Sequence, residues 1–289
     1  MAWRNILDGA LDVIAPGHPP TDGHDRADVF HERLRLHWAS AYAALGPPPP
    51  EDTRTFAYDS HLRAIDLVRG GQTAPAAQLL KGLADAGSLR ALTDLGVLRF
   101  RSGAVQEAQN LWREASTRSD TRAEHYLGLA LVRVGDSTQA ERCLRSAFHS
   151  GHALAGKDLG LLLRRAGRLK EAERTWTVAS EQGVADADSL LGLLWQERGD
   201  LERAQRWWLR GADRGSSHAA YNLGLLLAEQ DEFLEAAKWL RRASRAGHAR
   251  ASAGLAWVQR LEDAFLSRVY PEGDTDADSS IEPVNGREQ

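Results

Sequence analysis

Histidines near the N-terminus are the first residues whose types and spacing suggest chemistry. His31-Glu32 begins like the H-E-x-x-H signature of zinc proteases, in which two histidines four residues apart lie on one helix face. The next histidine is His37, six residues after His31, so the two do not share a face and the signature fails. His18 and His24 add two possible ligands, but no cysteine and no regular spacing accompany them, so we expect no metal site.

Other catalytic patterns are also missing from the sequence. It contains no G-x-x-x-x-G-K-[ST] phosphate loop and no G-x-S-x-G nucleophile elbow. Cys143 is the only cysteine, which excludes an intrachain disulfide. It lies in an apolar column beside Leu144, which indicates a buried hydrophobic residue rather than a reactive thiol. We therefore predict no enzyme activity and no cofactor.

Small residues recur instead on a fixed lattice. Glycines lie on one 32-residue lattice, with Ser119 as its single miss, at Gly87, Gly151, Gly183, Gly215 and Gly247. Alanines keep the same phase without exception, at Ala91, Ala123, Ala155, Ala187, Ala219 and Ala251. Only 26 of the 289 residues are glycine, so composition alone does not produce these columns. A constant period of this length is typical of a helical repeat array.

Each repeat is predicted to contain two helices. In residues 217–247, apolar residues at helical spacing are interrupted once and then resume. The glycine after the first helix, such as Gly135 or Gly199, suits the left-handed residue that ends a helix. Asp136 and Asp200 follow directly and suit the N-cap of the next helix. Because both loops are short, neighbouring helices must be antiparallel.

A further glycine column falls inside the first helix of each repeat, at Gly96, Gly128, Gly160, Gly192 and Gly224. A glycine inside a helix costs about 1 kcal/mol against alanine. The reason we infer is close helix approach, with large residues of the second helix filling the space. The large residues in that column include Trp112, Trp176 and Trp208. These columns are therefore interpreted as packing positions.

The columns resemble the tetratricopeptide superfamily, and particularly its Sel-one-like branch. The pattern A-x-x-x-L-G, a helix end at glycine, A-x-x-x-W and a closing A-x-x-x-G runs through residues 57–262 and is clearest in 219–224 (AAYNLG) and 236–247 (AAKWLRRASRAG). The Sel-one-like loop between the two helices carries extra residues that Gly199-Asp200-Leu201 lacks, so both branches stay open. Both imply an all-α, right-handed superhelical solenoid of antiparallel helix pairs that is used for protein–protein interaction.

Three regions follow from this pattern. Residues 1–50 contain two predicted amphipathic helices, 3–14 and 26–45, and a Pro-rich linker that ends with Pro47 to Pro50. Residues 51–270 form the array of six helix pairs, from near Phe56 to near Gly247. A closing helix over 249–269 is predicted to turn Leu255, Val258, Leu261 and Phe265 inward. Residues 271–289 form an acidic tail that is predicted to be disordered.

Charge is distributed unevenly along the chain. The formal net charge is −4, but residues 271–289 alone hold six carboxylates and one arginine, so the rest of the chain is close to neutral. A broad basic excess, as in many nucleic-acid-binding proteins, is missing. Asp8 and Asp12 interrupt the apolar N-terminal run, and no stretch is long enough to span a membrane. These features and the single cysteine predict a cytoplasmic protein, and the scarcity of lysine hints at a GC-rich bacterial genome.

The resemblance also implies a binding groove, because the first helix of each pair lines the concave face in such arrays. The candidate partner-binding residues at these positions are Arg90, Arg101, Arg122, His125, Tyr126, Arg133, Lys157, Arg164, Arg165, Tyr221, Asn222 and Trp257. Later repeats place Asp186, Glu197 and Glu229 at equivalent positions, so the groove is predicted to be basic at one end and more acidic at the other. The arginines have two simpler explanations, which are pairing with acids such as Asp94 and Asp158 or binding of the acidic tail. The family's carboxylate clamp of paired lysines and asparagines is not reproduced.

We predict a protein-interaction scaffold or adaptor that binds a peptide or partner domain, with an acidic segment, in this groove. One alternative is nucleic-acid binding through the arginine-rich N-terminal half, against which the near-neutral body argues. The other alternative is self-assembly through Trp3 and Ile6 or through the end of the array. The sequence names neither the partner nor the oligomeric state.

Overall fold

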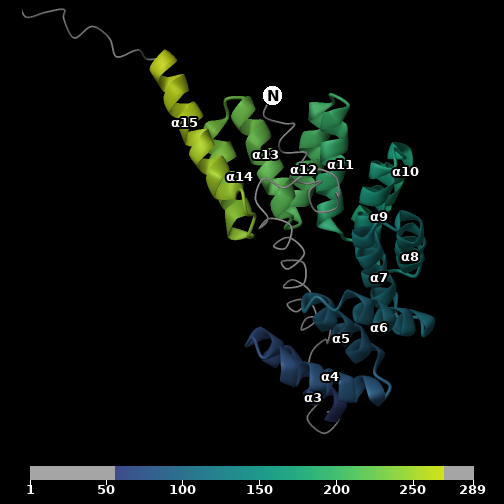
Figure 1. Cartoon of the computed structure of the whole chain (residues 1–289). Coiled ribbons are helices and arrows are strands. Elements are labelled where there is room, and N and C mark those ends of the chain that lie inside the picture. The colour runs from purple at the N-terminus through teal and green to yellow at the C-terminus, as the bar shows by residue number, and fades with distance from the viewer. Residues whose placement is uncertain (1–55, 270–289) are drawn as a thin grey trace, which may run out of the picture. The chain divides into compact units, whose positions relative to one another are not determined.

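The computed structural model describes residues 56–269, and this part of the chain consists of helices joined by short loops (Figure 1). The helices are α3 (Phe56–Arg69), α4 (Thr73–Asp85), α5 (Leu89–Arg101), α6 (Val105–Thr117), α7 (Thr121–Val134), α8 (Ser137–His149), α9 (Ala153–Arg165), α10 (Leu169–Glu181), α11 (Ala185–Glu197), α12 (Leu201–Asp213), α13 (Ser217–Glu229), α14 (Phe233–Arg245) and α15 (Ala251–Val269). The helices predicted at 3–14 and 26–45 and the tail predicted at 271–289 lie outside the described residues.

The chain divides into two compact units, Met1–Thr175 and Trp176–Gln289, with the boundary inside α10. We call the first helix of each pair an A helix and the second a B helix. The A helices are α3, α5, α7 and α9 in unit 1 and α11 and α13 in unit 2. From α3 to α9 in unit 1, and from α11 to α15 in unit 2, each helix packs on the next one along the chain, so A and B helices alternate in the stack. The predicted all-α solenoid of six helix pairs and a closing helix is therefore confirmed.

The loops depend on one left-handed residue at each turn. Gly135 ends α7 with a φ of 88°, as predicted for its column. Ser119 and Asp231, the two positions where a column lacks glycine, adopt φ values of 66° and 62°. Such residues cost about 1–2 kcal/mol there, so the turn geometry is required even without glycine. Asp136 and Asp200 cap the following helices as predicted, each accepting a backbone N–H at 3.0 Å.

The glycines inside the A helices allow the B helices to approach closely. A Cβ atom on Gly96 would overlap the indole of Trp112, and one on Gly192 would overlap that of Trp208. Both indoles are fully buried, and each donates its Nε1–H to a backbone carbonyl of its A helix, at 3.0 and 3.1 Å. The predicted packing role is confirmed for these two glycines.

The closing helix α15 buries less than its sequence predicts. Of the four residues predicted to turn inward, Val258 is 1% exposed, whereas Leu255, Leu261 and Phe265 are half-buried. Phe265 contacts Phe233 at the start of α14, with ring centroids 5.5 Å apart. Among the described helices α15 has neighbours on one side only, in α13 and α14, which explains the partial burial.

A test of the glycine contact compares two helical glycines. Gly96→Ala is expected to destabilise unit 1 by about 1–3 kcal/mol, because overpacking against Trp112 outweighs a helix-propensity gain of about 1 kcal/mol. Gly82→Ala in α4 is the matched control, because its Cβ would meet no atom within 4 Å. The control is expected to stabilise the protein by up to about 1 kcal/mol. Thermal unfolding followed by circular dichroism checks this, and shifts of the same sign in both variants would contradict it.

Candidate interaction surface

Each A helix has one side against its B helix and an opposite side, which we call the A face. In α5, Gly96 lies against Trp112, so Asp94, Leu98 and Arg101 lie on the other side of the helix. Residues spaced by three, four and seven positions form one stripe on a helix. In unit 1 this stripe consists of Leu62, Ile65, Asp66 and Arg69; Asp94, Val97, Leu98 and Arg101; Tyr126, Leu129, Ala130 and Arg133; and Asp158, Leu161, Leu162 and Arg165.

An arginine column runs along the A face of unit 1. It holds one arginine in the last turn of each A helix, at Arg69, Arg101, Arg133 and Arg165. In unit 2 the same lattice position holds Glu197 and Glu229. The helix dipole favours an arginine at a helix C-terminus and disfavours a glutamate, so it is consistent with the arginines of unit 1 but does not account for the glutamates of unit 2. Arg69 extends the set predicted from sequence, and the 32-residue spacing is sufficient to find it.

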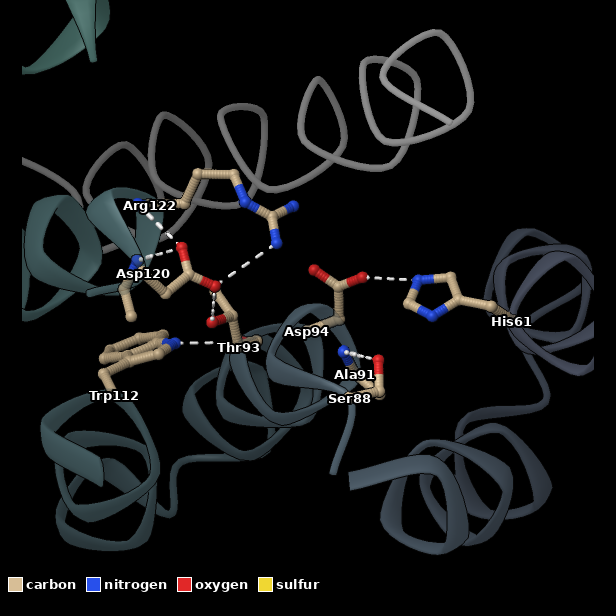
Figure 2. A network of polar contacts seen from close by, with 9 residues as sticks. His61, Ser88, Ala91, Thr93, Asp94, Trp112, Asp120 and Arg122 are labelled. Carbon is tan, nitrogen blue, oxygen red and sulfur yellow. Dashed lines mark hydrogen bonds and ion pairs between the residues drawn. The ribbon is translucent and has the colours of Figure 1, made fainter. Parts of the chain in front are cut away.

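Two of the predicted arginines are positioned by neighbouring side chains. The guanidinium group of Arg133 lies 5.0 Å from the ring centroid of Phe100, at cation–π distance. Arg122 approaches Asp120, with a guanidinium nitrogen 3.4 Å from Oδ2 (Figure 2). Asp120 caps α7 and also accepts a hydrogen bond from the hydroxyl of Thr93 at 2.8 Å. Arg122 therefore belongs to the polar cap of α7, whereas Arg133 extends over α5.

A buried histidine–aspartate pair joins α3 to α5. Figure 2 shows the two side chains pointing toward one another, with Nε2 of His61 2.8 Å from Oδ2 of Asp94. They are 4% and 0% exposed. A buried carboxylate is stable only with polar partners, so this contact fixes how the two A helices align.

The same pair recurs 64 residues later, where it has a third member. Nε2 of His125 lies 2.8 Å from Oδ2 of Asp158, and its Nδ1 lies 3.1 Å from Nε2 of His152. Burial lowers the pKa of His152 to about 4, with a further contribution from His125, so His152 is neutral at pH 7. His125 was predicted to line the groove, but the structure buries it instead. It is 7% exposed because it faces the neighbouring repeat.

Buried polar residues make the equivalent contacts in unit 2. Asn222, which is 5% exposed, donates an amide hydrogen to Oγ of Ser189 at 3.4 Å. Tyr221, which is 8% exposed, stacks on His248 with ring centroids 4.1 Å apart. Burial raises the pKa of Tyr221 and lowers that of His248 to about 3. Both predicted partner contacts, Tyr221 and Asn222, thus lie at junctions between repeats.

The other predicted residues are more accessible. Arg133 and Arg165 are exposed, and half-buried positions are held by Arg90, Arg101, Arg122, Tyr126, Lys157, Arg164 and Trp257. Tyr126 stacks on Trp112 with ring centroids 5.5 Å apart, and burial raises its pKa. The His-to-Asp spacing of 33 residues, repeated at His61 and His125, is the sequence signal that identifies the junction residues.

Residues 56–269 contain no cluster of three or more histidine, cysteine, aspartate or glutamate side chains suited to a metal ion. His18, His24, His31 and His37 lie outside this range. Cys143 is half-buried, and burial raises the pKa of its thiol, which keeps it protonated. No helix between residues 56 and 269 has both the length and the apolar character needed to cross a membrane.

Comparison with known proteins agrees with this architecture. Residues 127–177 match the family model described as Tetratricopeptide repeat, and no curated protein matches the chain. The chain is similar to a Sel1 repeat protein from Oxalobacter formigenes, with a TM-score of 0.55 and 21% identity, over 70% of this chain and 89% of that one. It is also similar to c5321, a protective antigen of uropathogenic Escherichia coli strains with an SLR fold, with a TM-score of 0.56 and 17% identity, over 99% of this chain and 66% of that one.

The described residues have the fold of a helical repeat protein, similar to that of the Sel1 repeat and SLR structures, and residues 127–177 match the tetratricopeptide model. The resemblance drawn from the alanine, Leu-Gly and tryptophan columns is confirmed. Proteins with this repeat fold typically mediate protein–protein interaction and are generally non-catalytic. In this repeat protein the glycine and alanine columns form the packing, the buried polar residues join neighbouring repeats, and the arginine column lies on the A face.

The junction between α7 and α9 is tested by a double-mutant cycle. His125→Leu is expected to destabilise unit 1 by about 3 kcal/mol, because it removes a partner of the buried Asp158 carboxylate. His125→Leu/Asp158→Leu is expected to lose less than the sum of the single variants, with a coupling energy of about 1 kcal/mol or more. Urea unfolding measures all four stabilities. His149→Leu, at an exposed histidine, is the control and should change stability by less than about 0.5 kcal/mol. Additive losses would contradict the pairing.

Lowering the pH is expected to reduce the free energy of unfolding of unit 1, because His152 binds a proton more readily in the unfolded state. Its pKa in the folded state, about 4, is lower than the unfolded value of about 6.5, so the unfolded state binds more protons between these pH values. The stabilisation is complete above pH 6.5 and is lost as pH falls toward 4, by about 2 kcal/mol at pH 5. His152→Gln removes this titration and should lose less stability between pH 7 and pH 5 in urea unfolding. Equal losses in variant and wild type would show that His152 does not titrate as described.

Proposed function

We propose that this protein is an adaptor whose unit 1 binds an extended, acidic segment of a partner protein along the A face. The single observation that supports this proposal is the arginine column, in which Arg69, Arg101, Arg133 and Arg165 recur at one position of four successive A helices. Guanidinium groups bind carboxylates through paired, charge-assisted hydrogen bonds.

The spacing of the column suits an extended peptide. Packed helices lie about 8–10 Å apart, and an extended chain advances about 3.3 Å per residue. Carboxylates at every third residue of the partner would therefore meet successive arginines. The half-buried side chains of Leu62 in α3 and Leu129 in α7 lie on the same stripe and offer apolar contacts for the residues between. The partner we propose thus alternates acidic and apolar positions.

The charge pattern favours unit 1 over unit 2 for the acidic segment. Lys157 and Arg164 are further cations on α9, and Arg90 is a further cation on α5. In unit 2, Glu197 and Glu229 replace the arginines and would repel an acidic segment. An acidic partner is thus expected on unit 1 alone, because like charges placed together oppose association.

A protein partner is favoured over nucleic acid. The column is a single row on an otherwise near-neutral chain, whereas nucleic-acid binding uses a broad basic surface that contacts many phosphates. Unit 1 also contains acidic residues that pair with arginines, such as Glu107, whose carboxylate lies 3.4 Å from the guanidinium of Arg99.

The proposal predicts binding of a fluorescein-labelled synthetic peptide with aspartate at every third position and leucine or alanine between. Fluorescence anisotropy with the full chain and with residues 51–289 measures its affinity. Arg101→Glu/Arg133→Glu should weaken binding by at least about tenfold, because two cations of the column are reversed. Arg142→Glu/Arg174→Glu carries the same charge change at exposed positions of the B helices α8 and α10, and it should stay within about twofold of wild type.

Two outcomes would overturn the proposal. Equal weakening by both double variants would mean that total charge, not the arginine column, sets the affinity. Tighter binding of a single-stranded oligothymidylate, with a steep dependence on salt, would identify a nucleic-acid-binding protein instead.

A further inference from the structure

Charge in unit 2 is divided between the A helices and the B helices. The A helices α11 and α13 hold four carboxylates and no lysine or arginine. The B helices α12 and α14 hold seven lysines and arginines against three carboxylates. The cations of unit 2 therefore lie on its B helices, whereas the arginine column of unit 1 lies on A helices.

The outward side of α12 and α14 presents one surface, which we call the B face of unit 2. Trp208 and Leu240 are fully buried, so the residues on the opposite side of each helix face outward. At spacings of three and four positions these are Arg203, Arg206, Trp207, Arg210 and Asp213 on α12, and Glu235, Lys238, Trp239, Arg242 and Arg245 on α14. Both helices pack on α13 (Figure 1), and Nη1 of Arg242 lies 3.2 Å from Oδ1 of Asp213, so the two stripes are adjacent.

The charged members of the B face are exposed, and some of its cations have no partner. Arg206 and Arg245 form no hydrogen bond or ion pair through their side chains with another residue between 56 and 269. Each lysine or arginine near an anionic bilayer adds to the free energy of binding. Lipid headgroups accept cations at any lateral spacing, so an open helical surface of this kind needs no groove to bind them.

Each tryptophan of the B face lies beside an arginine of the next turn of its helix. The guanidinium group of Arg210 lies 5.2 Å from the ring centroid of Trp207, and that of Arg242 lies 5.0 Å from that of Trp239. One ring face of each half-buried indole is thereby covered, which leaves little area for the base stacking that single-stranded nucleic acid requires. Indoles with a polar and an apolar side are instead typical of the headgroup level of a bilayer.

Exposed leucines adjoin the cations of the B face. Leu209 is 44% exposed and Leu234 is 67% exposed. Leu209 follows Arg206 by three residues and Leu234 precedes Lys238 by four, so each leucine lies beside a cation. Such leucines gain free energy on entering the boundary between headgroups and acyl chains, and a soluble polyanion offers them no apolar phase.

We propose that the B face of unit 2 binds the surface of a bilayer that contains anionic phospholipid. Its cations contact headgroup phosphates, while the two tryptophans and the adjoining leucines reach the boundary with the acyl chains. The protein lies on such a membrane and does not cross it. The B face belongs to another unit and to other helices than the arginine column, so this proposal does not rest on the acidic partner segment.

The charge requirement is tested by vesicle flotation with the full chain. The protein should float with vesicles of equal parts phosphatidylglycerol and phosphatidylcholine, and not with vesicles of phosphatidylcholine alone. Arg206→Glu/Lys238→Glu should lower the partition coefficient at least about tenfold, because two cations of the B face are reversed. Arg142→Glu/Arg174→Glu makes the same change at the same lattice positions of α8 and α10, and it should stay within about twofold of wild type.

The apolar contact is tested with Leu209→Ser/Leu234→Ser. This variant should bind the anionic vesicles at least about tenfold more weakly, because both leucines no longer enter the acyl boundary. Val134→Ser/Leu154→Ser, at positions of unit 1 that are 59% and 49% exposed, is the control and should bind as wild type does. Both variants should keep the thermal unfolding of wild type, because all four side chains are exposed.

The position of the indoles is measured by quenching of tryptophan fluorescence in vesicles that contain brominated phosphatidylcholine. Trp207→Phe/Trp239→Phe should remove most of the quenching, whereas Trp257→Phe on α15 should not. Quenching that survives the double variant unchanged would show that another surface meets the bilayer and would overturn the proposal.

The flotation measurements can overturn the proposal in three ways. The first is no binding to anionic vesicles, or equal weakening by the two charge variants. The second is wild-type binding by Leu209→Ser/Leu234→Ser, which would mean that the B face recognises soluble anions, such as nucleic acid or an acidic protein, rather than a bilayer. The third is weakening by Arg101→Glu/Arg133→Glu as large as that by Arg206→Glu/Lys238→Glu, which would assign the binding to the arginine column of unit 1.

Discussion

The close contact between each A helix and its B helix is the constraint on which the rest of the structure depends. Gly96 has no Cβ atom, and the indole of Trp112 occupies the space where one would lie. The same arrangement at Gly192 and Trp208 in unit 2 shows that this contact recurs through the array. Because the B helix fills one side of the A helix so completely, the remaining sides are left for the neighbouring repeats and for the A face.

The polar contacts between neighbouring repeats differ from one junction to the next, whereas the contact within each helix pair is similar throughout. Histidine–aspartate pairs join α3 to α5 and α7 to α9, whereas a serine–asparagine hydrogen bond joins α11 to α13. A buried polar group is costly without its partner, so a repeat in the wrong place would lose these contacts. The glycine and alanine columns make the repeats alike, whereas the different polar contacts between repeats favour one order of the repeats.

This division also limits which residues are available to a partner. His125 and Asn222 point toward neighbouring repeats, so they stabilise the stack and do not present polar groups to a ligand. The arginine column lies about two turns beyond, in the last turn of the A helices, where Arg133 and Arg165 are exposed. The charged groups that the proposed function assigns to recognition therefore lie at the ends of the A helices.

The sequence by itself determined the helix pairs, their loops and their packing columns, because these depend on local chemistry repeated at a fixed period. Left-handed turns, N-caps and mid-helix glycines each have a residue preference that is visible without the fold. The arginine column can be predicted from the sequence for the same reason, and Arg69 lies one 32-residue period before Arg101.

The burial of His125, Tyr221 and Asn222 was decided only by the tertiary structure. Helical periodicity gives the direction of a side chain around its own axis, but not whether a neighbouring helix or solvent lies in that direction. For residues on the flanks of an A helix, the packing of the next repeat decides whether a side chain is buried. This packing brings together residues 27 or 33 positions apart, as in the contacts of His125 with His152 and Asp158.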